Sequence, residues 1–292
     1  MILGRVSPSI PSAVAAWLSA QKLGDPVRLE PVGGGCINSA GILITSSGER
    51  FFLKTNPSCP ADMFACEADG LRALAKAEGG PRVPDVYLHG PDFILIEDLA
   101  PAPRSKTYWT DLGRQMASLH HYTAEKFGFE ADNYIGSTPQ PNPWTVEGYQ
   151  FYARHRFGFQ AEMAAQRGLL SHQELTLVSD LAARLPSLVP AQPASLMHGD
   201  LWNGNQITDA GGNPAIIDPA AYYGWAEADL AMMILFGSPG RGFWEAYNEV
   251  RPLEPGYQER FGLYNLYHLL NHLNLFGRSY HGQVVSALLR YR

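Results

Sequence analysis

Three polar side chains near the middle of the chain stand at a spacing that suits one kind of chemistry. Asp200 comes two residues after His198, and Asn205 follows five residues later, which is the H-x-D-x-x-x-x-N spacing of kinase catalytic loops. Asp218 ends an apolar β run, where the metal-binding Asp after such a loop is expected. We therefore predict that Asp200 orients or deprotonates an acceptor hydroxyl, and that Asn205 and Asp218 supply oxygen ligands to Mg²⁺.

The same residues also fit a plain structural interpretation. Asp and Asn favour turns on their own account, so the His-Gly-Asp triplet at 198–200 is typical of a surface turn when it is taken alone. The Ile-Ile-Asp triplet at 216–218 is typical of an ordinary strand end. All three polar side chains together, with a β-rich segment upstream, favour the catalytic interpretation.

Residues nearer the N-terminus supply the parts of a nucleotide site. Lys54 ends an apolar strand and Glu67 lies in the next helix, an arrangement in which Lys grips the α/β phosphates and Glu positions it. The glycine-rich turn at 33–38 is not a Walker A motif, because no G-K-[ST] follows, but its backbone amides can approach phosphate oxygens. After the strand at 93–97, backbone groups are placed to hydrogen-bond adenine. The predicted nucleotide-binding residues are Gly34, Gly35, Cys36, Asn38, Lys54, Glu67, Glu97 and Leu99. A solvated Lys, a hairpin glycine cluster and a buried edge strand are the structural alternatives.

The elements that must position these residues change character near residue 100. Residues 1–99 predict a helix over 11–22, strands over 27–32, 40–45, 50–54, 86–89 and 93–97, and a helix around Glu67. After the Pro-rich stretch at 100–103 the pattern is helical, with helices near 144–168 and 171–188 and a short β segment near 196–217. We expect an α+β chain with a β-rich N-lobe over 1–99, made of a five-stranded antiparallel sheet with one inserted helix. A larger, mainly helical C-lobe over 100–292 would complete a nucleotide crevice between the lobes.

Composition argues against several other functions. The formal net charge is −6 and no cluster of five Lys or Arg occurs, which argues against a nucleic acid or an anionic membrane as partner. No apolar run reaches the roughly 18 residues of a membrane span, and the N-terminus lacks the order of a secretory signal. Cys36, Cys59 and Cys66 form no CxxC pair, so we expect a reducing cytoplasm. His268 and His272 stand four apart without an HExxH pattern, which favours packing over zinc binding.

The chain resembles the fructosamine/ketosamine-3-kinase family, a branch of the protein-kinase-like superfamily close to aminoglycoside and choline kinases. The likeness runs along nearly the whole chain. Its narrowest segments are GSTPQPN at 136–142 and IDPAxYYG at 217–224, whereas HGDxxxxN at 198–205 is shared by the wider superfamily. The other shared segments are GGGCIN at 33–38, FLK at 52–54, EA at 67–68, EADLA at 227–231 and LFG at 275–277.

This resemblance implies a two-lobed protein-kinase-like fold and ATP-dependent, magnesium-assisted phosphorylation of the 3-hydroxyl of a ketosamine. The phosphorylated product sheds its sugar, so the expected role is deglycation of a small-molecule or protein-bound adduct. A residue like Asp229 braces the catalytic-loop backbone in the superfamily, and the segment at 135–142 is expected to shape the acceptor side of the cleft. The candidate acceptor contacts are His198, Trp202, Tyr222 and Glu227.

Departures from the family pattern leave the acceptor open. Trp225-Ala226 stands where a basic residue often precedes the Glu-Ala-Asp stretch, and Asn203 stands where a small residue often follows the Trp. Two alternatives therefore remain: a kinase of another small hydroxyl compound, such as an aminoglycoside, choline or homoserine, and a catalytically inactive nucleotide-binding pseudokinase. The sequence does not indicate the oligomeric state.

Overall fold

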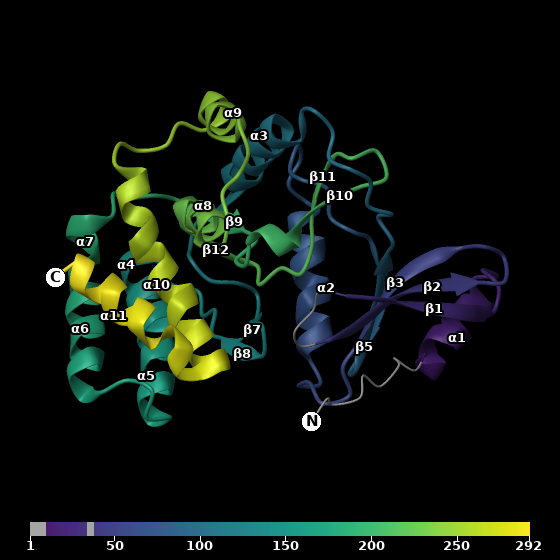
Figure 1. Cartoon of the computed structure of the whole chain (residues 1–292), viewed down its shortest axis with the longest axis horizontal. Coiled ribbons are helices and arrows are strands. Elements are labelled where there is room, and N and C mark those ends of the chain that lie inside the picture. Colours follow the sequence, from purple (N-terminus) through teal and green to yellow (C-terminus); the bar gives the residue numbers. More distant parts are fainter. Residues whose placement is uncertain (1–9, 34–37) are drawn as a thin grey trace.

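The chain folds into a sheet-rich part and a helix-rich part, at the right and the left of Figure 1. The structure, a computed structural model, describes residues 10–33 and 38–292. The sheet-rich part holds one antiparallel sheet in the order β1-β2-β3-β5-β4. Its strands are β1 (Pro26–Val32), β2 (Ser39–Thr45), β3 (Arg50–Thr55), β4 (Val86–Gly90) and β5 (Phe93–Glu97).

A helix packs on each face of this sheet. α1 (Ser12–Ala20) buries Val14 and Leu18 against a cluster that includes Leu53 and Leu95. α2 (Met63–Leu74) buries its apolar stripe against Ile94 and Ile96. Successive side chains of a strand point to opposite faces, so the two helices lie on opposite faces of the sheet.

The same alternation places Lys54. Leu53 faces α1, so Lys54 faces the other side of β3, where α2 carries Glu67. β3 thus places Lys54 on the side of the sheet that faces the helix-rich part of the molecule.

The second part is mainly helical and shares one large core, in which Leu112, Leu230 and Leu270 are fully buried. Its α-helices are α3 (Tyr108–His121), α4 (Gly148–Phe151), α5 (Phe159–Gln166), α6 (His172–Ala183), α7 (Leu185–Leu188), α8 (Ala226–Leu235), α9 (Phe243–Val250), α10 (Tyr257–Phe276) and α11 (His281–Arg290). A π-helix, η1 (Tyr152–Gly158), joins α4 to α5, and a 3₁₀ turn, η3 (Gly277–Tyr280), joins α10 to α11.

Short strands are set among these helices. β6 (Thr123–Ala124), β9 (Ala194–Met197) and β12 (Tyr222–Gly224) form one small sheet, and β7 (Asn133–Ile135) pairs with β8 (Thr138–Gln140). β10 (Gln206–Thr208) pairs with β11 (Pro214–Ile216), and the 3₁₀ turn η2 (Asn203–Asn205) precedes β10. The 198–205 loop therefore runs from β9 to β10, and Asp218 follows β11.

The α+β class and the five-stranded antiparallel sheet with its inserted helix are confirmed. The division at residues 99 and 100 stays a prediction, and it fits a sheet that ends at Glu97 and a helix that begins at Tyr108. Within residues 10–33 and 38–292, no helix combines the length and the apolar character needed to cross a bilayer.

Candidate active site

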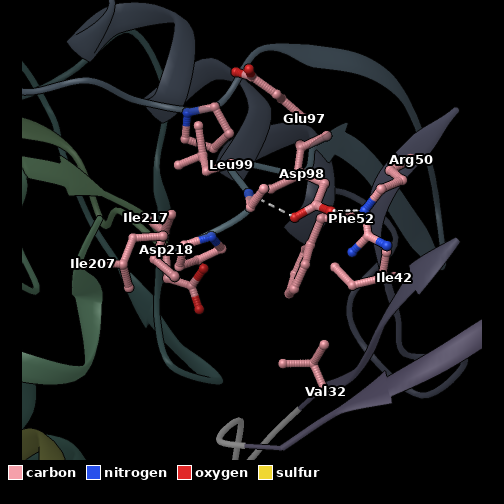
Figure 2. Close-up of a pocket in the computed structure, with 14 residues that line it drawn as sticks. Val32, Ile42, Arg50, Phe52, Glu97, Asp98, Leu99, Ile207, Ile217 and Asp218 are labelled. Atoms are coloured by element: carbon pink, nitrogen blue, oxygen red, sulfur yellow. Dashed lines mark hydrogen bonds and ion pairs between the residues drawn. The ribbon is translucent and has the colours of Figure 1, made fainter. Parts of the chain in front are cut away.

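A cavity of about 430 Å³ lies where the sheet meets the helix-rich part. Figure 2 shows Phe52 and Ile42 of the sheet on one side of it, and Ile207 and Ile217 on the other. Asp218 points its carboxylate into the space between them. Apolar walls with one convergent carboxylate suit a flat heteroaromatic ring that carries a charged tail.

The chain leaves the sheet along the rim of this cavity. The Asp98 carboxylate accepts hydrogen bonds from Arg50 Nε at 2.9 Å and from the Ala100 amide at 3.0 Å (Figure 2). The Glu97 carboxylate forms an ion pair with Arg82 instead. Glu97 and Leu99 line the cavity, but the Glu97 side chain points away from it (Figure 2), so backbone groups at this rim remain the candidates for base recognition.

Lys54 joins the two parts of the molecule electrostatically. Its Nζ lies 2.6 Å from Glu67 Oε1 and also contacts Asp218 Oδ1. Burial alone would lower the pKa of the Lys54 ammonium, but the Asp218 and Glu67 carboxylates outweigh that effect and raise the pKa above its usual value. Lys54 is therefore a fixed cation, 4% exposed, at the edge of the cavity.

Asp200 and Asn205 stand beside Asp218, as their spacing predicts. Asn205 Nδ2 donates to the Asp200 carbonyl oxygen at 2.8 Å and lies 3.4 Å from Asp200 Oδ2 and 3.5 Å from the Asp218 carbonyl oxygen. Burial, together with the nearby Asp218 and Asp229 carboxylates, raises the pKa of Asp200 to about 7. A carboxyl group with such a pKa can exchange a proton near neutral pH.

The 198–200 backbone is braced from behind by Asp229. Its carboxylate accepts the backbone N–H groups of His198 at 2.7 Å and Gly199 at 2.8 Å. Although burial by itself would raise the pKa of Asp229, hydrogen bonds and the neighbouring His120 hold it below its usual value. Gly199 has a φ of 82°, and a Cβ there would lie 2.1 Å from the Ala220 carbonyl oxygen, so only glycine fits.

The donor set around Asp218 fits a magnesium ion. Asp218 offers a carboxylate that is 45% exposed, and Asn205 has Nδ2 committed to donation, which leaves Oδ1 as the atom able to coordinate. In the described part of the chain, no group of three or more His, Cys, Asp and Glu residues forms a complete cage. Mg²⁺ typically takes one or two protein oxygens and completes its shell with phosphates and waters, so a partial protein shell suits it.

The chain matches a known protein family. The family model described as fructosamine kinase matches residues 11–291, nearly the whole chain. The chain belongs to the fructosamine kinase family. The resemblance inferred from the 136–142 and 217–224 segments is thereby confirmed.

Relatives of this family carry related names. A "probable ketoamine kinase" from Synechocystis sp. is 40% identical over 290 residues, which cover 97% of each chain. A chloroplastic protein-ribulosamine 3-kinase from Oryza sativa subsp. indica is 40% identical over 270 residues, covering 89% of this chain and 77% of the rice protein. A solved structure from Thermobifida fusca that bears a fructosamine-3-kinase name superposes with a TM-score of 0.87 at 32% identity, covering 97% of this chain and 99% of that one. The two-lobed kinase-like fold is confirmed by this match.

The candidate acceptor residues are not all placed alike. His198 is fully buried: its Nε2 lies 2.8 Å from the Ile217 carbonyl oxygen, and burial lowers its pKa, so it is a neutral part of the loop scaffold. Glu227 is buried in an ion pair with Arg260 and accepts a hydrogen bond from Tyr264. Tyr222 is buried beneath the Arg156 guanidinium. Trp202, two residues after Asp200, is half-buried, so it alone of the four is partly open to a ligand.

Among the predicted phosphate-loop residues, Gly34, Gly35 and Cys36 lie outside the described residues. Asn38 directly precedes β2, and its Oδ1 accepts a hydrogen bond from Asn56 Nδ2 at 3.0 Å. The roles assigned to this turn therefore stay predictions.

Two sets of contacts near the site were not predicted from the sequence. Arg50 and Asp98 are 48 positions apart and meet only because β3 pairs with β5. The acceptor-side role of the segment at 135–142 stays a prediction, and the bonds from the buried Asn133 and Gln140 side chains to the Ala221 and Ala220 carbonyl oxygens were not foreseen. An Asn-rich, Gln-containing stretch in a Pro-rich loop is a weak signal that could have indicated buried amides, because such side chains have four hydrogen-bonding positions to satisfy.

Proposed function

We propose that the chain is an ATP-dependent kinase that phosphorylates the 3-hydroxyl of ketosamines, the adducts of a sugar on an amine. The observation that carries this proposal is that Lys54, Asp200 and Asn205 are gathered around Asp218, which lines one apolar cavity. The family membership and the names of its relatives support the acceptor class. The phosphorylated ketosamine would shed its sugar, so the reaction would reverse glycation of a small amine or of a protein, and we place it in the cytoplasm.

ATP would bind with its base between Phe52 and Ile217 and with its phosphates toward Lys54. The Lys54 ammonium is already held by Glu67 of α2, so it loses little conformational entropy when phosphate oxygens replace its Asp218 contact. Glu67 thus acts as a positioning residue, and Lys54 as the direct phosphate ligand.

Asp218 and Asn205 would hold the magnesium ion that ATP carries. The ion supplies charge neutralisation for the phosphates when it is bound. What the chain itself contributes is one carboxylate and one amide oxygen, and the Asn205 Nδ2 group, which donates to the Asp200 carbonyl oxygen and lies 3.5 Å from that of Asp218, keeps the two close together.

Asp200 would accept the proton of the attacking 3-hydroxyl. Its pKa of about 7 makes it a better proton acceptor than an ordinary carboxylate while leaving it largely ionised at slightly alkaline pH. Trp202, which follows it and is half-buried, is the candidate for contact with the sugar. We leave His198 and Glu227 out of the acceptor site because the loop backbone and Arg260 already occupy their polar atoms.

A panel of acceptors tests this proposal. ADP production coupled to ATP should depend on ribulosamines or fructosamines, and the product should release its sugar. Turnover of an aminoglycoside, choline or homoserine in preference to every ketosamine would contradict the acceptor class and leave the kinase chemistry intact. Magnesium-dependent ATP binding without turnover of any acceptor would instead indicate a pseudokinase.

A further inference from the structure

The backbone that carries Asp218 has a conformation that its own sequence disfavours. Asp218 has a φ of 59°, in the left-handed region that costs a non-glycine residue free energy. It also precedes Pro219, and a residue before proline prefers a φ of roughly −120°. Such a conformation persists only where the surrounding contacts over-determine it. The contacts behind Asp218 are therefore part of what aims its carboxylate into the cavity.

Two buried side-chain amides hold the backbone just after Pro219. Asn133 Nδ2, on β7, donates to the Ala221 carbonyl oxygen at 2.8 Å. Gln140 Nε2, on β8, donates to the Ala220 carbonyl oxygen at 3.1 Å. From the opposite side, the Ala220 amide donates to the His198 carbonyl oxygen at 2.9 Å. The backbone of residues 220 and 221 is thus held between the β7–β8 hairpin and the loop that carries Asp200.

The two amides are themselves locked in orientation. Asn133 Oδ1 accepts from Gln140 Nε2 at 2.7 Å and from Asn142 Nδ2 at 2.9 Å. Tyr267 donates its hydroxyl to Gln140 Oε1 at 2.6 Å. Asn133 and Gln140 are 5% and 1% exposed, so water is poorly placed to replace these bonds. A closed amide network of this kind fixes a single arrangement of its members.

Arg156 completes the network from the π-helix η1. It is fully buried, and its Nη2 donates to Asn142 Oδ1 at 2.6 Å while Nη1 donates to the Pro141 carbonyl oxygen at 2.8 Å. Its guanidinium carbon lies 3.9 Å from the ring centroid of Tyr222. The acceptors of these bonds are neutral, which is a costly environment for a buried cation. A π-helix is a distortion that is frequent at functional sites. Together with the cost of burying a cation, it indicates that Arg156 serves to hold Pro141 and Asn142 of the hairpin segment in place.

The geometry points to Asn133 and Gln140 as positioning residues for Asp218, which set the affinity of the protein for a magnesium-bound nucleotide. This inference rests on the proposed function, because it takes Asp218 as a magnesium ligand. The charged contact in front of Asp218 cannot do the same work in the complex, since Lys54 is expected to turn to the phosphates. The bonds from the hairpin do not involve any ligand and persist when the nucleotide binds.

Nucleotide binding by the full chain, without acceptor, tests this inference. The measurement is the dissociation constant of ADP in the presence of excess magnesium and in the presence of EDTA, and their ratio is the magnesium increment. Asn133→Leu removes the donor to Ala221 and should reduce the increment about tenfold, as loss of a residue that orients a metal ligand typically does. Its affinity for ADP in EDTA should stay within about twofold of the wild type, because the base and Lys54 contacts are unchanged.

Asn265→Leu is the matched control. Asn265 is 5% exposed, as Asn133 is, and its Nδ2 donates to the Ala231 carbonyl oxygen at 2.8 Å, a bond outside the network that holds residues 220 and 221. Both variants lose a buried amide bond and should unfold at a lower temperature, but only Asn133→Leu should lose the magnesium increment. If Asn133→Leu does not fold, Gln140→Met, which is close to Gln in size and removes the donor to Ala220, takes its place with the same expected loss.

Three outcomes would overturn the inference. An unchanged increment in both the Asn133 and Gln140 variants would show that Asp218 does not depend on the hairpin. An equal loss in Asn265→Leu would reduce the effect to general stability. A wild-type protein with no magnesium increment would overturn both the inference and the metal assignment. Failure to turn over ketosamines while the increment behaves as expected would contradict the proposed acceptor alone.

Discussion

The two sides of Asp218 are built on different physical principles. In front, its carboxylate contacts Lys54, which Glu67 also holds, and lies near the Asp200 carboxyl group; 45% of the Asp218 side chain is exposed. Behind, the backbone meets neutral amides from Asn133 and Gln140, both almost fully buried. Ligands can rearrange the front, because ion pairs exchange readily with phosphates and metal ions. The back has no such partners to exchange, so it keeps the frame constant while the charges change.

Among the changes in front of Asp218, replacing the proton acceptor Asp200 should lower activity the most. Asp200→Asn keeps the size of the side chain and removes its basicity, so kcat should fall about 1,000-fold or more. The dissociation constant of magnesium ADP should change by no more than a few fold, because Asp200 does not hold the nucleotide. Steady-state kinetics and equilibrium binding on the same preparation check this. A variant that kept near-normal turnover would show that another group accepts the proton.

Removing the cation tests whether the front depends on charge. Lys54→Met should lower kcat/KM for ATP on the order of 100-fold, as loss of a preorganised charge contact to the reacting phosphates does. The variant also leaves Glu67 and Asp218 close together without the ammonium that separates them. Lys54→Arg is the control that keeps the charge and changes the shape, and it should recover part of the ATP affinity. Equal kinetics in Met and Arg variants would contradict a role for the charge.

The stability of the ligand-free protein should depend on pH through Asp200. Its pKa is about 7 in the folded protein, above its usual 3.8, so the folded state binds the proton more tightly than the unfolded state. Stability from this group is therefore greatest in acid and declines as pH rises from about 4 to about 7, with no further change above. Thermal unfolding of wild type and Asp200→Asn across this range should differ in slope. Parallel curves would show that Asp200 does not titrate there.

The titration of Asp200 also predicts that activity rises with pH. With Asp200 as the base, kcat/KM for the acceptor should increase with pH and level off at or below about 7, because the magnesium ion bound beside Asp200 favours the ionised carboxylate. The conditions that favour catalysis are thus those in which the ionised Asp200 contributes least to stability, as expected for a charged group held in an active site.

The smallest effect on activity is expected far from both sides of Asp218. Glu227→Gln weakens the buried pair with Arg260 and should lower the free energy of unfolding by about 2 kcal/mol. Its kcat/KM for ketosamines should stay within about twofold of the wild type at a temperature where it is folded. A large rise in acceptor KM with unchanged stability would restore Glu227 as an acceptor contact.

The sequence predicted the front of the site better than the back. Lys54, Glu67, Asp200, Asn205 and Asp218 were predicted because chemistry restricts their types and spacing, and the structure brings them together. The strands around Lys54 were predicted from short apolar runs bounded by turns, a pattern that suits a sheet covered by a helix on each face.

The back could not be predicted in the same way. β7 and β8 have three residues each, too few for a period to show. The bonds from Asn133 and Gln140 reach about 80 residues along the chain, and the amide side chains carry no charge that marks a partner. Arginine is usually a surface residue, so the burial of Arg156 was not expected. Arg156 lies in a π-helix, which local propensity does not specify.

A structure with magnesium and a non-hydrolysable ATP analogue tests the central claim most directly. The account predicts the base between Phe52 and Ile217, Lys54 on the phosphates, and Asp218 and Asn205 oxygens at about 2.1 Å from the metal. Asp200 should remain free of the metal and face the acceptor side. A complex in which Asp218 still pairs with Lys54 while the metal sits on Asp200 would contradict the account.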